Sequence, residues 1–342
     1  MPKSRILFLY YDPHYFHAAL AKAIGAKPWP APTIRSSEKS MIRVLAGGAS
    51  SLRAIVSLPR DYDVYFCEGT FIFPAMAKRL GLLKKGAKII NIVSSPLFYY
   101  MKTGRVSGAR RSLAVSLLRE VDGFVCVGKM EEQLLKHFSP NAKTIVTYPF
   151  IRREVVRAIA KEGRPQLNTK EILFVGNRDT HYKGLDLLLA AFRKAREKVP
   201  GLRLTIVGDY DSDVVGPDRE GIRCIGKVRS TARYIKGASL YVHLGRGEAF
   251  GVSVMEALLA GLPVLVSDQT GAKELIYGID KRMVVPLDAS AASARIAQYF
   301  MLSTAEKGRL ARKGIEMVKR YSEDLIIRKF KDDYQNLLKA KP

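Results

Sequence analysis

Short apolar runs alternate with amphipathic stretches along the whole chain. Runs typical of buried strands lie at 6–10, 64–67, 89–93, 123–127 and 144–147, and a second set begins at 172 and continues at 202–207, 222–225, 240–243, 263–267 and 283–285. Helical apolar spacing is found at 186–198, 232–236, 252–260 and 289–301. Strands that alternate with helices form parallel sheets covered on both faces, so the pattern predicts an α/β protein.

The chain is long enough for two domains. It has 342 residues, of which 47% are hydrophobic, and two Rossmann-like halves fit that size. A charged stretch with glycine and proline, 152–169, separates the two sets of strands and is predicted to be the linker. We therefore expect domains at 1–155 and 156–321, followed by a terminal helix within 322–342.

The segment from Gly247 to Asp268 carries the clearest indication of a ligand site. Apolar spacing predicts a helix over 252–260, and glycine is the usual left-handed terminator, here Gly261. The first amides of this helix have no intrahelical acceptor and lie at the positive end of the helix dipole. An anion such as a diphosphate is therefore expected against Gly251 and Val252.

Two carboxylates bracket the start of that helix. Glu248 precedes it and Glu256 lies about one turn inside it. Eight residues of helix span about 12 Å, whereas a hydrolytic acid pair stands roughly 5 to 9.5 Å apart. Separate carboxylates suit the vicinal hydroxyls of a sugar and a ribose. The alternative is an ordinary surface helix with two solvated glutamates.

A second, cationic segment lies upstream at 171–192. It runs from a strand through a polar loop into an amphipathic helix, and Arg178 and Lys183 flank the loop. Arginine offers a planar fork and lysine a point charge, and both kinds of group bind phosphate oxygens. The pair predicts a diphosphate site, unless both are merely surface charges of a basic chain.

Taken in order, these motifs resemble a known family. Gly176-x-Arg178, then Lys183-Gly184, Val207-Gly208-Asp209 and the Glu248…Glu256 pair are similar to the donor site of retaining GT-B glycosyltransferases, family 4 most closely. The resemblance covers roughly 172–275. It implies two Rossmann-like domains with parallel sheets facing across a cleft, the first binding an acceptor and the second a nucleotide-diphosphate sugar, UDP- or GDP-linked. It also implies that the terminal helix packs back on the first domain.

The resemblance assigns roles to individual residues. Arg178 and Lys183 would stabilise the departing diphosphate, Glu248 would hold the sugar and Glu256 the ribose, with the leaving phosphate itself deprotonating the acceptor. The expected catalytic residues are Arg178, Lys183 and Glu248, and the expected donor-binding residues are Gly176, Val228, Phe250, Gly251, Val252 and Glu256. Many relatives carry a histidine where this chain has Ser94 and Ser95, so these serines, with Asp12 and His14, are the candidates for the acceptor cleft.

No cofactor and no metal are expected. Arginine and lysine can neutralise the diphosphate that a divalent ion would otherwise handle. Asp209, Asp211 and Asp213 offer an alternative, a metal-binding carboxylate cluster like that of the other glycosyltransferase architecture.

The charge balance points to an anionic partner. With 57 Lys and Arg against 32 Asp and Glu, the net charge is +25, and basic residues crowd the region from 78 to 153. The apolar residues 97–101 directly precede a basic stretch at 102–119, a composition typical of a helix in a membrane interface. An anionic membrane surface and a lipid-linked acceptor are thus expected partners, although solvated charge is the commoner explanation of any one cluster.

The chain is expected to be cytoplasmic and peripheral on the membrane face. It has no run of 18 apolar residues and no signal-peptide pattern, and its three cysteines lack metal spacing. Two other functions stay open. One is a sugar-nucleotide epimerase of the same architecture. The other is a nucleic-acid-binding protein, which the lack of aromatic residues interleaved with Lys and Arg disfavours.

Overall fold

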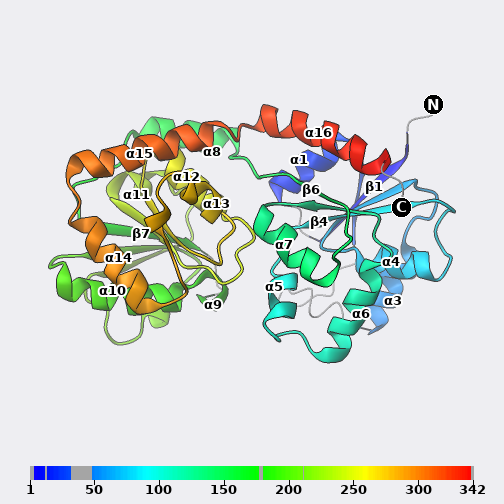
Figure 1. The fold of residues 1–342 in the computed structure, drawn as a ribbon, viewed down its shortest axis with the longest axis horizontal. Helices are drawn as coiled ribbons and strands as arrows, with labels where there is room; N and C mark the ends of the chain where they lie inside the picture. Colours follow the sequence, from blue (N-terminus) through cyan, green and yellow to red (C-terminus); the bar gives the residue numbers. More distant parts are fainter. Residues whose placement is uncertain (1–3, 12–13, 32–47, 177–179, 211, 340–342) are drawn as a thin grey trace. The chain divides into compact units, whose positions relative to one another are not determined.

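The computed structural model describes residues 4–11, 14–31, 48–176, 180–210 and 212–339. The chain divides into two compact units, Met1–Pro149 with Asp324–Pro342, and Phe150–Glu323 (Figure 1). Each unit contains a parallel sheet, six-stranded within the described residues, with helices on both faces. The prediction of an α/β protein with two parallel sheets is confirmed.

The sheet of the first unit has the strand order β2-β1-β3-β4-β5-β6. Its strands are β1 (Ile6–Tyr10), β2 (Lys27–Pro30), β3 (Val64–Glu68), β4 (Lys88–Val93), β5 (Gly123–Cys126) and β6 (Thr144–Val146). Strand β2 was not predicted, because Pro28 and Pro30 leave it no apolar run. Proline is tolerated on an edge strand, and β2 is the edge of this sheet.

Both faces of this sheet are buried. The helices are α1 (Tyr15–Ala23), α3 (Gly48–Ser57), α4 (Ile72–Arg79), α5 (Leu97–Lys102), α6 (Gly108–Leu118), α7 (Lys129–Phe138) and α16 (Glu323–Lys339). Helices α1 and α16 cover one face and α3 to α7 the other (Figure 1). Leu7 and Leu9 join the core beneath α4 to α7, whereas Phe8 points to the opposite face and contacts Phe66. Burial on both sides explains why the strands are continuous apolar runs.

The terminal helix α16 packs against the middle of this sheet. The rings of Phe330 and Tyr334 lie 6.2 and 6.0 Å from the ring of Phe66 on β3. Leu337 lies over Gly123 of β5, where a Cβ atom would stand 2.9 Å from its side chain. The two fully buried aromatic rings of α16 thus complete the core of the first unit.

Residues 97–101 do not form the expected membrane anchor. Leu97, Phe98 and Met101 are at most 3% exposed and belong to the core beneath α4 to α7. The prediction of an interfacial apolar helix is wrong for these residues, because a five-residue apolar run carries no information about which surface covers it.

The sheet of the second unit has the order β12-β11-β10-β7-β8-β9. Its strands are β7 (Glu171–Gly176), β8 (Arg203–Gly208), β9 (Ile222–Gly226), β10 (Leu240–His243), β11 (Val264–Ser267) and β12 (Val284–Val285). Two short 3-10 helices, η1 (Ser212–Val215) and η2 (Lys281–Met283), lie in its loops. The strands agree with the predicted runs to within a residue or two.

Helices cover both faces of the second sheet as well. They are α8 (Arg153–Glu162), α9 (Thr180–Lys183), α10 (Leu185–Lys198), α11 (Ala232–Gly237), α12 (Val252–Ala260), α13 (Lys273–Tyr277), α14 (Ala289–Phe300) and α15 (Thr304–Lys319). Figure 1 shows α10 and α14 below the sheet and α8, α11, α12, α13 and α15 above it. The stretch 152–169 was predicted to be a linker, but it contains α8, which packs on α11 and α12 through the buried Ile159. That prediction is wrong.

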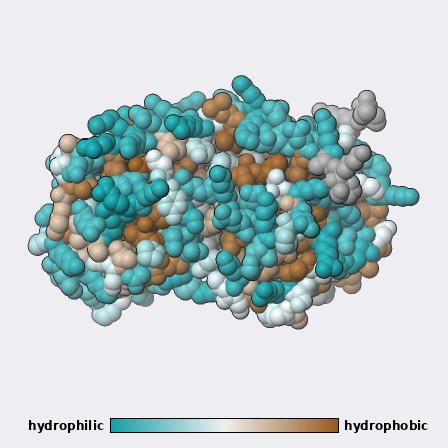
Figure 2. All heavy atoms as spheres, viewed as in Figure 1, coloured by the Kyte–Doolittle hydropathy of each residue, from teal (hydrophilic) through white to brown (hydrophobic). Residues whose placement is uncertain are grey.

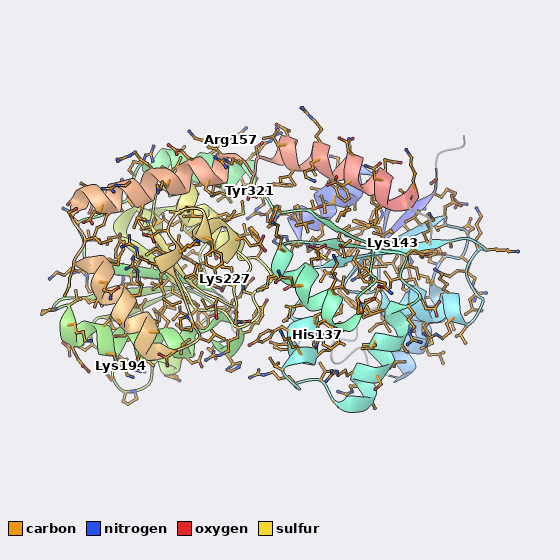
Figure 3. All side chains as sticks on the ribbon, in the orientation of Figure 1. His137, Lys143, Arg157, Lys194, Lys227 and Tyr321 are labelled. Carbon is orange, nitrogen blue, oxygen red and sulfur yellow. The ribbon has the colours of Figure 1, made fainter. Side chains whose placement is uncertain are left out.

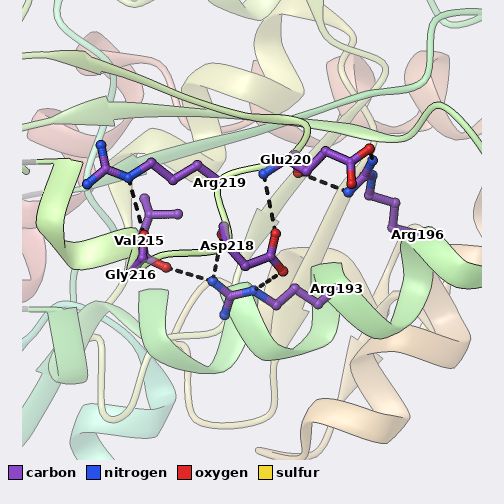
Figure 4. Close-up of polar contacts among 7 residues, drawn as sticks. All are labelled: Arg193, Arg196, Val215, Gly216, Asp218, Arg219 and Glu220. Carbon is purple, nitrogen blue, oxygen red and sulfur yellow. Dashed lines mark hydrogen bonds and ion pairs between the residues drawn. The ribbon is translucent and has the colours of Figure 1, made fainter.

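Two arginines of α10 hold the loop that precedes β9 (Figure 4). Arg193 donates from Nη2 to the Val215 carbonyl at 2.6 Å and from Nε to Asp218 Oδ2 at 3.1 Å. Arg196 donates to the Glu220 carbonyl at 3.2 Å. These groups are partly exposed, so the network fixes the course of the loop and contributes little to stability.

Hydrophilic side chains cover most of the surface drawn in Figure 2. Lys194 of α10 and Lys227 after β9, both labelled in Figure 3, are exposed. In the part of the chain that the structure describes, no helix has the length and apolar character needed to span a membrane.

Candidate active site

The strand order of the second unit indicates where a ligand would bind. The chain runs from β7 to β8 and β9, and then returns to the other side of β7 as β10. Open α/β sheets bind ligands outside the carboxyl ends of their strands at such a reversal. Lys183 ends the short helix α9 after β7 and Glu248 lies in the turn after β10, and the two predicted residues meet at this point.

The turn after β10 is fixed by backbone hydrogen bonds to the turn after β11. Gly247 donates to the Gln269 carbonyl at 3.0 Å, and Gly271 donates to the Glu248 carbonyl at 2.8 Å. Phe250, only 3% exposed, anchors the same turn in the core. The backbone around Glu248 is therefore held in one conformation.

Helix α12 begins directly after this turn and spans the predicted residues 252–260. Gly251 precedes it with φ 90°, a left-handed conformation that favours glycine. Gly261 ends it with φ 88°, as expected for a left-handed terminator. Amides in the first turn of any helix have no intrahelical acceptor, so Gly251 and the half-buried Val252 border a site suited to an anion.

Lys183 and Glu248 form an ion pair. The Lys183 ammonium donates to Glu248 Oε2, and the two side chains are 19% and 11% exposed. Burial alone would raise the pKa of Glu248, but the charge of Lys183 and the nearby imidazole of His243 outweigh it and hold that pKa well below its usual value. The carboxylate is therefore ionised throughout the physiological pH range.

His243 lies beneath this pair and was not predicted as a site residue. It is 1% exposed and stacks on Phe174 and Tyr241, with ring centroids 5.9 and 6.3 Å away. Its Nε2 atom lies 3.6 Å from Glu248 Oε2, and burial lowers the pKa of the imidazole although Glu248 opposes that shift. In the sequence it only ends an apolar run, so nothing there distinguishes it from a core residue.

Glu256 occupies a separate environment one turn into α12. Burial raises its pKa to about 7, against the charge of Arg152 and a hydrogen bond from Thr231. The Thr231 hydroxyl donates to Glu256 Oε2 at 3.5 Å. The two acids therefore differ in charge state near neutral pH.

The remaining donor-side residues are placed only in part. Gly176 ends β7, where a Cβ atom would stand 2.5 Å from the Tyr210 hydroxyl oxygen. Val228 is half-buried just after β9. Arg178, like Asp12 on the acceptor side, lies outside the described residues.

Of the residues predicted for the acceptor side, His14 lies at the corresponding reversal of the first sheet, between β1 and β3, and the two serines follow β4. His14 follows β1, and its backbone amide donates to Glu68 Oε1 at 3.2 Å. His17 Nδ1 lies 2.6 Å from the same oxygen. Ser94 and Ser95, both half-buried, follow β4 at the same edge. Glu68 was not predicted from the sequence, although it ends an apolar run directly before Gly69 and Thr70.

No group of three or more His, Cys, Asp or Glu side chains suited to a metal ion occurs among the described residues. Of the alternative aspartate cluster, Asp211 lies outside these residues, and Asp213 is 3.5 Å from the guanidinium of Arg219.

Part of the second unit is similar to a known protein family. Residues 169–301 match the family described as glycosyl transferases group 1. A phosphatidyl-myo-inositol mannosyltransferase of Mycobacterium leprae is 30% identical over 172 residues, which is 48% of this chain and 46% of that protein. A glycogen synthase of Mycobacterium tuberculosis is 29% identical over 211 residues, or 57% and 50%. The chain thus spans about half the length of these curated relatives.

Solved structures resemble nearly the whole chain. A sucrose-phosphate synthase from Thermosynechococcus elongatus matches with a TM-score of 0.74 at 17% identity, over 99% of this chain and 100% of that one. Anabaena HepE in complex with UDP and glucose matches with a TM-score of 0.70 at 14% identity, over 97% and 100%. The fold is GT-B. The segment that matches the family, 169–301, contains Lys183, Glu248 and Glu256.

Proposed function

We propose that the protein is a glycosyltransferase that moves a sugar from a nucleotide-diphosphate donor to an acceptor hydroxyl. One observation carries the proposal. Lys183 of α9 and Glu248 are 65 residues apart in the sequence and meet beside the start of α12, inside the segment that matches the glycosyl transferases group 1 family. A cation for the diphosphate and a carboxylate for the sugar then stand at one site.

The donor is proposed to be UDP- or GDP-linked. The Lys183 ammonium and the first amides of α12 suit the two phosphates, and the similar HepE structure holds UDP and glucose. Glu248 accepts hydrogen bonds from the sugar and Glu256 from the ribose, while the backbone at Val228 meets the base. Arg178 supplies the second positive charge on the diphosphate.

The reaction is proposed to retain the anomeric configuration, as in family 4. The bond between the anomeric carbon and the phosphate oxygen breaks while the acceptor oxygen bonds on the same face, and the leaving diphosphate takes the acceptor proton. Lys183 and Arg178 stabilise the negative charge that develops on that leaving group. The chemistry then requires no metal and no cofactor.

The acceptor is proposed to be lipid-linked or a glycan, met at an anionic membrane surface on the cytoplasmic side. Lys102, Arg105, Arg111 and Arg119 on and beside α6 are exposed, and a relative is named as a phosphatidyl-myo-inositol mannosyltransferase. Since Leu97, Phe98 and Met101 are buried, attraction between these cations and anionic lipid is the main contribution. Co-sedimentation with vesicles containing phosphatidylglycerol should therefore weaken as salt rises, and binding to neutral vesicles of equal strength would contradict the proposal.

The direct test is a panel of UDP- and GDP-sugars incubated with the protein, with and without membrane lipid extract, followed by product analysis. Transfer to an acceptor in a product of unchanged anomeric configuration supports the proposal. Conversion of the nucleotide sugar without any acceptor would favour the epimerase. Consumption that is equal in Lys183→Ala and in the wild-type protein would remove this site from the reaction.

A further inference from the structure

The segment 180–186, here called the Lys183 turn, contains α9 and is docked against the turn that carries Glu248. Arg246 donates four hydrogen bonds across this contact. Its Nη1 and Nη2 atoms donate to the two carboxylate oxygens of Asp186 at 2.7 and 2.9 Å. Nη1 also donates to the His181 carbonyl at 2.7 Å. The backbone amide of Arg246 donates to the Tyr182 carbonyl at 2.8 Å.

The two backbones also touch directly. Gly184 follows Lys183 with φ 71° and lies against the carbonyl of Leu244 so closely that a Cβ atom would overlap that oxygen. Contacts thus hold the residues on both sides of Lys183, from His181 to Asp186. Without them, the four-residue α9 would be too short to keep its own conformation.

The Arg246 contacts are suited to fixing geometry. The Arg246 side chain is 17% exposed and that of Asp186 is 48% exposed. Because Asp186 is half exposed, the ion pair contributes little to the free energy of unfolding. The planar guanidinium with its two parallel hydrogen bonds nevertheless fixes the distance and direction between Arg246 and Asp186. Arg246 lies two residues before Glu248. Because it holds the Lys183 turn in one orientation, it sets the distance between the Lys183 ammonium and the Glu248 carboxylate.

We propose that Arg246, with Asp186 as its partner, is a positioning residue that sets where the Lys183 ammonium stands relative to Glu248. The inference rests on the proposed function, in which that ammonium meets the donor diphosphate. Arg246 itself contacts neither substrate in this scheme. Its loss would let the Lys183 turn move, and misplacement by about 1 Å can lower turnover on the order of 100-fold.

The test compares Arg246→Met and Arg246→Lys with Arg193→Met. Arg193 is the matched control, because it lies on α10 and also pairs with an aspartate, but that aspartate is Asp218 in the loop before β9 (Figure 4). Arg246→Met should lower kcat by roughly 10- to 100-fold and weaken UDP or GDP binding, with the thermal midpoint close to that of Arg193→Met. The kcat of Arg246→Lys should be nearly as low, because lysine keeps the charge but cannot make the two parallel hydrogen bonds of the guanidinium. Arg193→Met should keep wild-type turnover.

Two further measurements separate positioning from a general structural effect. Amide hydrogen exchange in residues 180–186 should accelerate in Arg246→Met and stay unchanged in Arg193→Met. In a Lys183→Ala background, Arg246→Met should cause no additional loss of UDP or GDP affinity, because Arg246 acts through Lys183.

Several outcomes overturn the proposal: unchanged exchange in Arg246→Met, faster exchange with unchanged kcat and affinity, or full additivity with Lys183→Ala. Failure of the proposed function has a different signature, since the wild-type protein would then bind neither UDP nor GDP. In that case, accelerated exchange in Arg246→Met still supports docking of this turn by Arg246, and unchanged exchange still refutes it.

Discussion

The buried carboxyl of Glu256 leads to the most specific prediction. Its protonation should affect both the stability of the fold and the affinity for the nucleotide. In the folded protein its pKa is about 7, whereas an ordinary glutamate has a pKa of 4.5. The folded state therefore keeps a proton that the unfolded state releases near pH 4.5. Stability must fall as pH rises from about 4.5 to about 7, because in that window the folded state binds more protons than the unfolded state.

The perturbation is Glu256→Gln, which keeps an oxygen able to accept from Thr231 but carries no titratable proton. A difference of about 2.5 pKa units corresponds to on the order of 3 kcal/mol. Above pH 8 the wild-type protein carries the free-energy cost of a buried, ionised carboxylate, and the variant does not. Its melting temperature relative to wild type should thus rise by several degrees between pH 5 and pH 8.5.

The assay is thermal unfolding of both proteins across that pH range, with UDP and GDP titrations in parallel. The wild-type affinity should rise with pH through about 7 as the carboxylate ionises, and the variant should bind more weakly, on the order of 10-fold or more, with no such pH dependence. A constant difference in melting temperature from pH 5 to pH 8.5 would refute the reasoning about burial. A pH-independent wild-type affinity would remove Glu256 from the ribose site.

Two other predictions follow from the packing and the charges. Lys183→Ala should lower turnover on the order of 10² to 10³, because the leaving diphosphate loses a cation, while circular dichroism shows the fold intact; a loss below fivefold in a steady-state assay would contradict this role. Phe330→Ala should cost about 3–5 kcal/mol in urea unfolding, because the ring is fully buried against Phe66. A cost below 1 kcal/mol would show that α16 is not part of that core.

Much of the fold followed from the pattern of apolar residues. Helix α12 has the predicted bounds, because apolar spacing and two flanking glycines mark both of its ends. Strand β2 was not predicted, because its sequence, KPWP, has no apolar run and its position at the sheet edge depends on the tertiary structure. Helix α8 was taken for a linker because only Ile159 of its residues is buried, so its apolar face is narrow.

The site was predictable to a lesser degree. The spacing of Glu248 and Glu256 relative to a helix start is local, so the sequence contains it. The pairing of Lys183 with Glu248 and the docking of Asp186 by Arg246 join residues 65 and 60 positions apart, and only the strand order brings them together. His243 was missed because a buried histidine at the end of a strand looks like any other core position.

The central claim is that the second unit binds a nucleoside diphosphate at Lys183. Isothermal titration of the protein with UDP and with GDP tests it most directly, with Lys183→Ala beside the wild type. The account predicts binding of at least one of the two nucleotides and a loss of affinity on the order of 10-fold or more in the variant. Absence of binding by the wild-type protein, or equal affinity in the two proteins, would contradict it.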